Sequence, residues 1–227
     1  MKKLMVILGL LGCSNWVMAQ PAINKHPNTS EAGWTDMFTP NLSNALAPKN
    51  VWTVSEGVIT ASSDEALWSE KQYNDFMLDL EFKNAPGTNS GIIVHATETE
   101  EWIPHSVEIQ IADDYSEQWG KAPAYWQCGA VFGHQPVTKR TVKPAGEWNH
   151  ITITCIGRNI YIVLNGELVN ECNMSLFTSG EINPDGSKVP AWLPNPMATL
   201  PLYGRIGFQG KHAGAPIYFR NIKIKEL

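Results

Sequence analysis

Ionisable side chains gather in residues 89–134, where three short apolar segments, NSGIIVHA, SVEIQIADD and QCGAVFGH, follow one another. The middle segment alternates with period 2, so Glu108 and Gln110 face away from the apolar side chains beside them. The preceding segment ends near His95, and two aspartates directly follow the middle one. Imidazole and carboxylate groups can transfer protons, whereas a site that only binds can rely on aromatic rings and amides. The stretch therefore predicts a polar site, and its ionisable groups favour catalysis.

The same alternation has a plainer interpretation, because Glu and Gln also occupy the solvated face of ordinary strands. The nearby histidine, aspartates and tryptophans strengthen the case for a site, but the pattern alone does not decide between a site and a plain surface. Nine tryptophans are many for 227 residues, and Trp often stacks on sugar rings. Large aromatic side chains also fill the cores of β-sandwiches, so the tryptophan count alone leaves both readings open.

Apolar alternation dominates the elements that must position these residues, and no long segment has the 3.6-residue period of a helix. Strands are expected over 51–54, 57–61, 76–83, 91–96, 106–112, 128–133, 148–156, 159–165, 167–173, 203–209 and 216–226. Many short strands separated by Gly, Pro and Asn predict an all-β sandwich or jelly roll. Asn165-Gly166 predicts a tight hairpin, and the lysines of the last strand suit a sheet edge.

Two long loops interrupt the expected strands. Residues 113–127 contain Trp119, Tyr125 and Trp126, and residues 174–202 contain five prolines and a tryptophan. Loops of this length are often lids or binding loops, although proline bracing of a surface excursion would explain the second without a ligand.

The first 19 residues have the pattern of a signal peptide, with two lysines, a short apolar run and the sequence VMA before the expected cleavage site. The run is too short to span a bilayer. A competing pattern, LLGC, resembles a lipobox and would leave Cys13 lipidated. Either pattern predicts export to the periplasm, the cell surface or the medium, with residues 20–227 forming one domain.

The chain has a formal net charge of −5, which becomes about −7 when the two lysines of the signal peptide are removed. This charge argues against nucleic acid and anionic membranes as partners. Cleavage after residue 19 would leave three of the four cysteines, and no CxxC spacing occurs. We therefore expect no obligatory disulfide.

Nine sequence blocks follow one another in order: GWTDMF, VWTVSEGVITA, LWSEKQYNDFMLDLEFK, GTNSGIIVHA, HSVEIQIADD, CGAVFG, GEWNHITITCIGRNIYIVLNGELV, GRIGFQG and YFRNIKIKEL. This series resembles the 3-keto-disaccharide hydrolase domain family of exported bacterial proteins, from about Gly33 to Leu227. The resemblance implies a concanavalin-like jelly roll of two antiparallel sheets, whose concave polar face holds a carbohydrate. It also implies cleavage of the glycosidic bond of glycosides whose glucose ring is oxidised at C3.

A 3-keto group acidifies the hydrogen on C2, so a base can remove it and the enolate can expel the glycosidic oxygen from C1. Adding water to the product completes a net hydrolysis. Such a site needs a base, an electrophile at the C3 oxygen and an acid for the leaving group. A carbohydrate-binding module without catalytic activity is the alternative, because jelly rolls serve both functions.

The resemblance implies Glu108, His95 and Lys71 as catalytic residues. It implies Asn89, Gln110, Gln209 and His212 as substrate-binding residues, with Trp68, Tyr125 and Trp126 as candidate sugar platforms. In an open alternative, His95, Glu108 and Asp113 hold a divalent metal ion that acts as a Lewis acid. The chain departs from the family pattern at His95, where Arg is expected, and at Gln209-Gly210-Lys211-His212, where many relatives read Gln-Asp-His-Gly.

Overall fold

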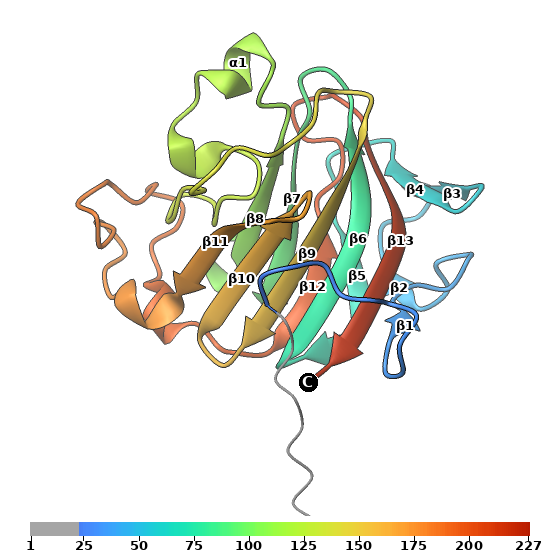
Figure 1. Ribbon diagram of the computed structural model, residues 1–227, viewed down its shortest axis with the longest axis horizontal. Coiled ribbons are helices and arrows are strands. Elements are labelled where there is room, and N and C mark those ends of the chain that lie inside the picture. The colour runs from blue at the N-terminus through green and yellow to red at the C-terminus, as the bar shows by residue number, and fades with distance from the viewer. Residues whose placement is uncertain (1–22) are drawn as a thin grey trace, which may run out of the picture.

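Two antiparallel sheets pack face to face in the computed structural model, which describes residues 23–227 (Figure 1). The eight-stranded sheet contains β1 (Thr35–Asp36), β3 (Trp52–Ser55), β4 (Val58–Ala61), β6 (Phe76–Asn84), β9 (Trp148–Ile156), β10 (Asn159–Leu164), β11 (Glu167–Asn173) and β13 (Ile217–Glu226). The five-stranded sheet contains β2 (Ala45–Leu46), β5 (Leu67–Tyr73), β7 (Asn89–Ala96), β8 (Val107–Ala112) and β12 (Gly204–Phe208). The predicted β-sandwich of two antiparallel sheets is confirmed.

The larger sheet has the order β11-β10-β9-β6-β13-β4-β3, with β1 paired to β13, and the smaller has the order β2-β5-β12-β7-β8. The remaining elements are short: η1 (Ile103–His105), α1 (Glu117–Gly120), η2 (Ala124–Trp126), η3 (Met174–Leu176) and η4 (Met197–Thr199). Among residues 23–227, no helix has the length and apolar character needed to cross a membrane.

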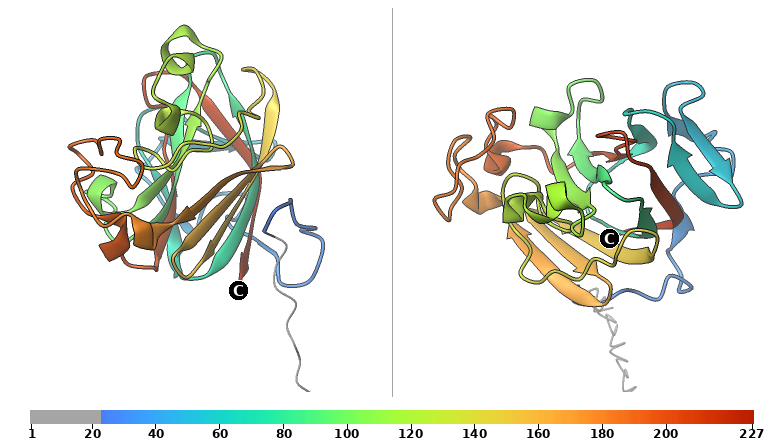
Figure 2. Two further views of the ribbon diagram at one scale, coloured as in Figure 1. Left: turned by 60° about the vertical axis from the view of Figure 1, so that its left-hand side comes forward. Right: turned by 90° about the horizontal axis from the view of Figure 1, so that it is seen from above.

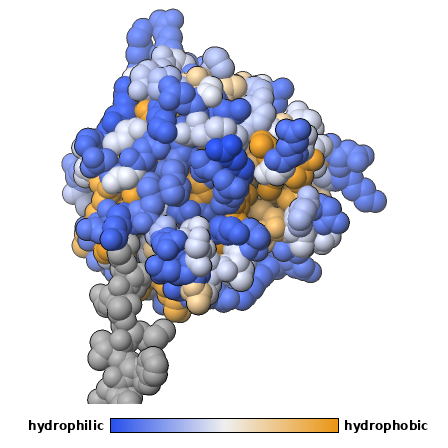
Figure 3. All heavy atoms as spheres, turned by 45° about the vertical axis from the view of Figure 1, so that its right-hand side comes forward, coloured by the Kyte–Doolittle hydropathy of each residue, from blue (hydrophilic) through white to orange (hydrophobic). Residues whose placement is uncertain are grey.

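The hydrophobic core lies between the sheets. In β8, Val107, Ile109 and Ile111 are all buried in it, as the alternation predicted. Full burial of such a side chain contributes about 1.5–3 kcal/mol relative to exposure, so the core fixes which face of β8 points outward. The face shown in Figure 3 is largely hydrophilic, with apolar side chains exposed in several places among the polar ones.

The hairpin between β10 and β11 is confirmed, because Asn165 and Gly166 both adopt positive φ angles, 52° and 88°, between Leu164 and its partner Glu167. The three cysteines within residues 23–227 are buried and free. The predicted signal peptide and the lipobox at Cys13 fall in residues 1–22, outside the described residues.

Two strand predictions are wrong. Residues 128–133 form turns with isolated bridges, because Gly129 and Gly133 adopt positive φ angles of 87° and 72° and bend the chain beside β8. The last strand, β13, is not an edge, since β6 lies on one side of it and β4 and β1 lie on the other. Its lysines therefore line an outer face of the sheet rather than an unpaired border.

Both long loops lie on the side of the sandwich next to β8 (Figure 2). The first runs through α1 and η2, and the second connects β11 to β12 through η3 and η4. The turn after the first loop is joined to the second loop by the buried pair of His134 Nδ1 and Asn183 Oδ1, 3.0 Å apart. The loops thus form a wall beside the face of the five-stranded sheet that points away from the core.

Candidate active site

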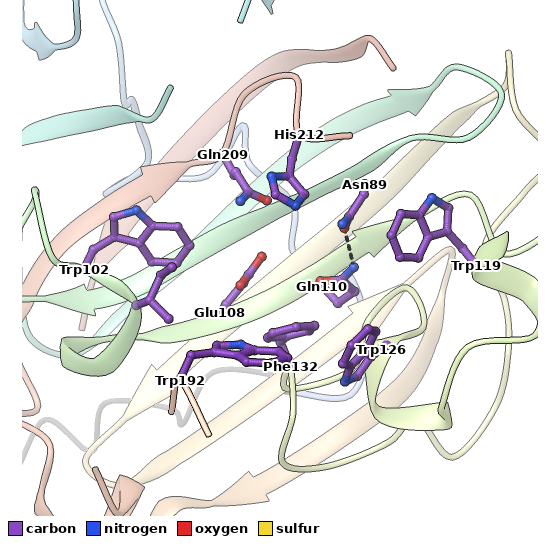
Figure 4. A pocket seen from close by; sticks show the side chains of 11 residues that line it. Asn89, Trp102, Glu108, Gln110, Trp119, Trp126, Phe132, Trp192, Gln209 and His212 are labelled. Carbon is purple, nitrogen blue, oxygen red and sulfur yellow. Dashed lines mark hydrogen bonds between the residues drawn. The ribbon is translucent and has the colours of Figure 1, made fainter. Parts of the chain in front are cut away.

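A cavity of about 360 Å³ lies on the outer face of β7 and β8. Its polar lining comes from Asn89 on β7, Glu108 and Gln110 on β8, and Gln209 and His212 in the segment after β12. Its apolar lining comes from the loops: Trp102, Ile103, Trp119, Trp126, Phe132 and Trp192. Figure 4 shows these side chains arranged around Glu108.

The side chain of Glu108 lies over Gly91 of β7, where a larger residue would displace it. Gly91 pairs with Gln110 in the β7–β8 ladder, and a Cβ atom added to Gly91 would overlap Oε1 of Glu108. Burial among protein atoms, and secondly the negative charge of Asp64, raise the pKa of Glu108 to about 8. Glu108 is thus mostly protonated at neutral pH and can donate a proton.

His212 forms a carboxylate–imidazole pair with Asp64, whose Oδ2 lies 2.6 Å from Nδ1 of His212. Both side chains are partly exposed, so Nε2 of the imidazole remains available to a ligand. The segment is fixed to β7 by a bridge between His212 and Asn89 and by the Gln209 N–H group, which donates to the Gly91 carbonyl at 2.9 Å. Sequence reasoning missed Asp64, because it lies 148 residues from His212 and has no motif of its own.

Gln110 and Asn89 form an ordered amide pair at the floor of the cavity. Nε2 of Gln110 donates to Oδ1 of Asn89 at 2.8 Å, and Gln110 is buried. The bond orients both amides, which leaves Nδ2 of Asn89 as a donor and Oε1 of Gln110 as an acceptor. A donor and an acceptor held side by side suit the hydroxyl and carbonyl groups of a sugar.

The aromatic wall is held by polar contacts in the loop between β8 and residue 128. Nε1 of Trp119 donates to the Gly87 carbonyl at 2.9 Å. The buried carboxylate of Asp114 accepts the Cys128 N–H group at 3.1 Å. Trp126 packs edge-on against Trp192 of the second loop, with ring centroids 6.1 Å apart. Rings positioned in this way can stack on a sugar.

The structure does not bring His95 to the cavity. Two residues of β7, Val94 and His95, lie opposite the single residue Ile206 of β12, and this arrangement is a β-bulge. His95 has a φ angle of 58°. The bulge puts His95 on the core side, 6.1 Å from the ring of Phe76, rather than on the outer face that strict alternation predicts. Burial lowers the pKa of His95 to about 4. We propose no catalytic role for it.

Lys71 and Asp113 also lie away from the cavity. Lys71 is exposed, forms an ion pair with Glu226 and lies over the ring of Tyr73. The Glu226 carboxylate, as its hydrogen-bond partner, raises the pKa of Lys71. Asp113 is buried and accepts the N–H groups of Gly87 at 2.9 Å and Tyr115 at 3.2 Å, so it closes a loop.

The proposed metal ligands His95, Glu108 and Asp113 are therefore not brought together. A different group within residues 23–227 has the side-chain types of a metal site: His26, Asp79 and His150. Their potential ligand atoms all lie within 4.8 Å of one another. The imidazoles of this group stack at 3.6 Å with an interplanar angle of 13°, so their in-plane lone pairs run parallel rather than converging. Nε2 of His26 accepts the Gly166 N–H group and His150 contacts Asp79, so these side chains already have partners.

Trp68 and Tyr125, both within the described residues, are not part of the lining of this cavity. Trp68 lies over Gly207, where a Cβ atom would overlap its ring, and it lines an adjoining cavity of about 460 Å³. Tyr125 contributes its carbonyl oxygen to the Gly133 N–H group at 3.1 Å. The structure thus brings together Asn89, Glu108, Gln110, Trp126, Gln209 and His212 of the predicted residues.

The jelly-roll sandwich places this chain in a class of fold that includes a carbohydrate-binding module. CBM66 from Bacillus subtilis matches with a TM-score of 0.51 at 11% identity, over 83% of this chain and 99% of that chain. This likeness concerns the fold alone.

The chain belongs to the 3-keto-alpha-glucoside-1,2-lyase-like domain family, whose model matches residues 23–225. A crystal structure of a candidate glycosyl hydrolase from Parabacteroides distasonis ATCC 8503 is 51% identical, with a TM-score of 0.84 over 86% of this chain and 99% of that chain. A second candidate glycosyl hydrolase from that organism, 23% identical, shares the fold with a TM-score of 0.70 over 90% of this chain and 99% of that chain. No curated protein matches the chain.

Proposed function

We propose that the chain is an exported enzyme that cleaves the glycosidic bond of 3-keto-glycosides by elimination across C1 and C2. The observation that supports this most is the pairing of two ionisable sites in one cavity: Glu108, whose pKa is raised to about 8, and the imidazole of His212 held by Asp64. A carboxyl group that keeps its proton can act as an acid, and an imidazole held by a carboxylate can act as a base. The family match and the 51% identical candidate glycosyl hydrolase support activity on a glycoside.

In this mechanism His212 is the base. Asp64 binds Nδ1, so Nε2 takes the proton from C2 and the carboxylate stabilises the resulting imidazolium. The electron pair of the C2–H bond forms the enolate, with its charge on the C3 oxygen. Asn89 is the donor to that oxygen, because Gln110 already occupies its Oδ1 and leaves Nδ2 free.

Glu108 is the acid. As the enolate collapses, the C1=C2 bond forms and the C1–O bond breaks, and protonated Glu108 transfers its proton to the leaving oxygen. The products are a conjugated enone and the free alcohol. In the hydrolytic version, water then adds to C1 and a proton returns to C2, so the net reaction consumes one water.

The test compares two substrates of the purified protein, a 3-keto-disaccharide and 4-nitrophenyl 3-keto-glucoside. Nitrophenolate leaves without protonation, whereas a sugar alkoxide does not. We expect Glu108→Gln to lower kcat on the disaccharide by about 10²–10⁴-fold and to affect the nitrophenyl glycoside much less. His212→Asn should slow both substrates.

Glu98→Gln is the control, because Glu98 is exposed and lines neither cavity. Wild-type activity on the disaccharide should fall as the pH rises above about 8, since deprotonated Glu108 cannot donate, and Glu108→Gln should lack this decline. Equal losses on both substrates in Glu108→Gln would exclude the acid role.

A carbohydrate-binding module is the second candidate function, and the aromatic wall with its amide pair is the observation that favours it. A module would bind 3-keto-glycosides in a calorimeter without releasing nitrophenol. Binding without turnover, in the presence of an intact Glu108 and His212, would select this alternative.

A further inference from the structure

The cavity beside the candidate active site shares part of its wall. Trp102, Ile103, Gln209 and His212 line both cavities, and the second one has a volume of about 460 Å³. His212 is thus at the junction. In the proposed elimination His212 takes the C2 proton next to the bond that breaks, so the two halves of the substrate must extend to either side of it.

The keto-sugar half belongs in the first cavity, which contains Glu108 and the Asn89–Gln110 amide pair. The leaving half then occupies the second cavity. That cavity has an aromatic corner, because the ring of buried Trp68 meets Trp102 edge-on with centroids 6.2 Å apart. Ala47 and Pro48 add apolar surface.

The charged side chains of the second cavity are all carboxylates. Asp64, Glu65 and Glu100 line it, and Glu108 lies in the first cavity. In residues 23–227, no Lys or Arg lines either cavity. His212 lines both cavities and can become cationic, but Asp64 already pairs with it. A negative ligand in the second cavity would therefore meet like charges and no Lys or Arg in the lining.

We propose, on the basis of the function proposed above, that the second cavity is the leaving-group subsite and that it selects neutral or cationic leaving groups against anionic ones. Aromatic surface provides the contact area, and the carboxylates provide the charge selection. Glycosides of sugar alcohols, phenols or amines fit this subsite, whereas glycosides that carry a carboxylate or phosphate on the leaving group are rejected.

The test uses 3-keto-glucosides of 4-hydroxybenzamide, 4-hydroxybenzoate and 4-hydroxybenzylamine, whose leaving groups share a shape and differ in charge. At neutral pH and low salt we expect kcat/KM for the benzoate to be lower than for the benzamide by about tenfold or more. The difference should narrow in high salt, because exposed charges are screened.

The variant E65Q/E100Q should reduce the difference in kcat/KM between the benzoate and benzamide glycosides. The matched control E98Q/E101Q should keep the wild-type ratio, since Glu98 and Glu101 lie in the same loop as Glu100 but line neither cavity. Cleavage of all three glycosides with equal kcat/KM, or a ratio that E65Q/E100Q leaves unchanged, overturns this inference alone. No cleavage of any of the three overturns the proposed function as well.

Discussion

The carboxyl group of Glu108 depends on the absence of a side chain at Gly91. The two residues lie on neighbouring strands, and Glu108 bends over the bare Cα of Gly91 into the cavity. The position of the proposed acid is therefore set by a glycine that itself touches no substrate in the proposed mechanism.

Gly91→Ala should displace Glu108 without unfolding the protein, because Gly91 does not occupy the left-handed region that favours glycine. We expect kcat on a 3-keto-disaccharide to fall toward the value of the Glu108→Gln variant. The pH at which activity declines, near 8 in the wild type, should also shift, because the carboxyl group of Glu108 leaves its buried surroundings. The measurements are the pH profile of kcat and the unfolding temperature. Wild-type kcat and pH profile in a folded variant would contradict this positioning role.

Residues on regular strands could be placed from the sequence, and residues whose position depends on irregular backbone could not. Glu108 and Gln110 follow directly from the alternation of β8. His95 follows the same alternation in the sequence but lies on the opposite face, because the bulge depends on how β12 pairs with β7. Asp64 enters the site from a loop that only the tertiary fold brings to His212.

At the scale of elements, the strands with clear alternation match the prediction closely, including β8 and the β9–β10–β11 meander. The strand β5 was missed, because its sequence LWSEKQY has three consecutive exposed residues. Its pairing with β12 is shifted between Arg205 and Gly207, so no simple period marks it. Irregular strands of this kind are specified by their neighbours rather than by local pattern.

The loop with Trp119 and Trp126 contains a buried acid, Asp114, that accepts the Cys128 N–H group. Burial raises the pKa of Asp114 to about 6, despite the Cys128 N–H group and Arg140, whose Nε lies 3.7 Å away. The folded protein therefore binds this proton more tightly than the unfolded chain, whose pKa is 3.8. The contribution to stability is present below about pH 4 and is lost as the pH rises to about 6.

Asp114→Asn should remove that pH dependence while keeping an oxygen for the Cys128 N–H group. We expect the unfolding temperature of the variant to rise relative to that of the wild type as the pH increases from about 4 to about 6. The exposed loop residue Glu117 provides the control, and Glu117→Gln should follow the wild type. A constant difference across this pH range would show that Asp114 does not titrate as described.

At the scale of the whole molecule, the segment before β1 crosses the outer face of the larger sheet (Figure 1). His26 fixes it there: its ring stacks on His150 of β9, Nδ1 lies 2.8 Å from Thr152 Oγ1, and Nε2 accepts the Gly166 N–H group at 2.9 Å. No sequence pattern predicts this contact, because His26 lies 126 positions from Thr152 and 140 positions from Gly166. The sheet order depends on such distant pairings as well, whereas the sandwich class follows from short alternating strands.

The His26 contact should make the stability of the protein sensitive to mild acid. Burial, together with the nearby His150, lowers the pKa of His26 from 6.5 to about 4, although Asp79 opposes the shift. The unfolded chain then takes up the proton first, so the stabilisation is complete above about pH 6.5 and is lost as the pH falls toward 4. A protonated Nε2 would also face the Gly166 N–H group as a second donor.

His26→Phe keeps a ring that can stack on His150 but cannot titrate, so its urea unfolding midpoint should decline less than that of the wild type between pH 6.5 and pH 4.5. His26→Ala should be less stable at all of these pH values, because it also loses the stack. His105→Phe is the control, since His105 lies in η1, between β7 and β8, and the hydrogen bond of its ring is to the Glu101 carbonyl rather than to the segment before β1. Parallel decline of the wild type and His26→Phe would mean that the acid sensitivity arises elsewhere, and the segment before β1 would then be held by packing rather than by an uncharged imidazole.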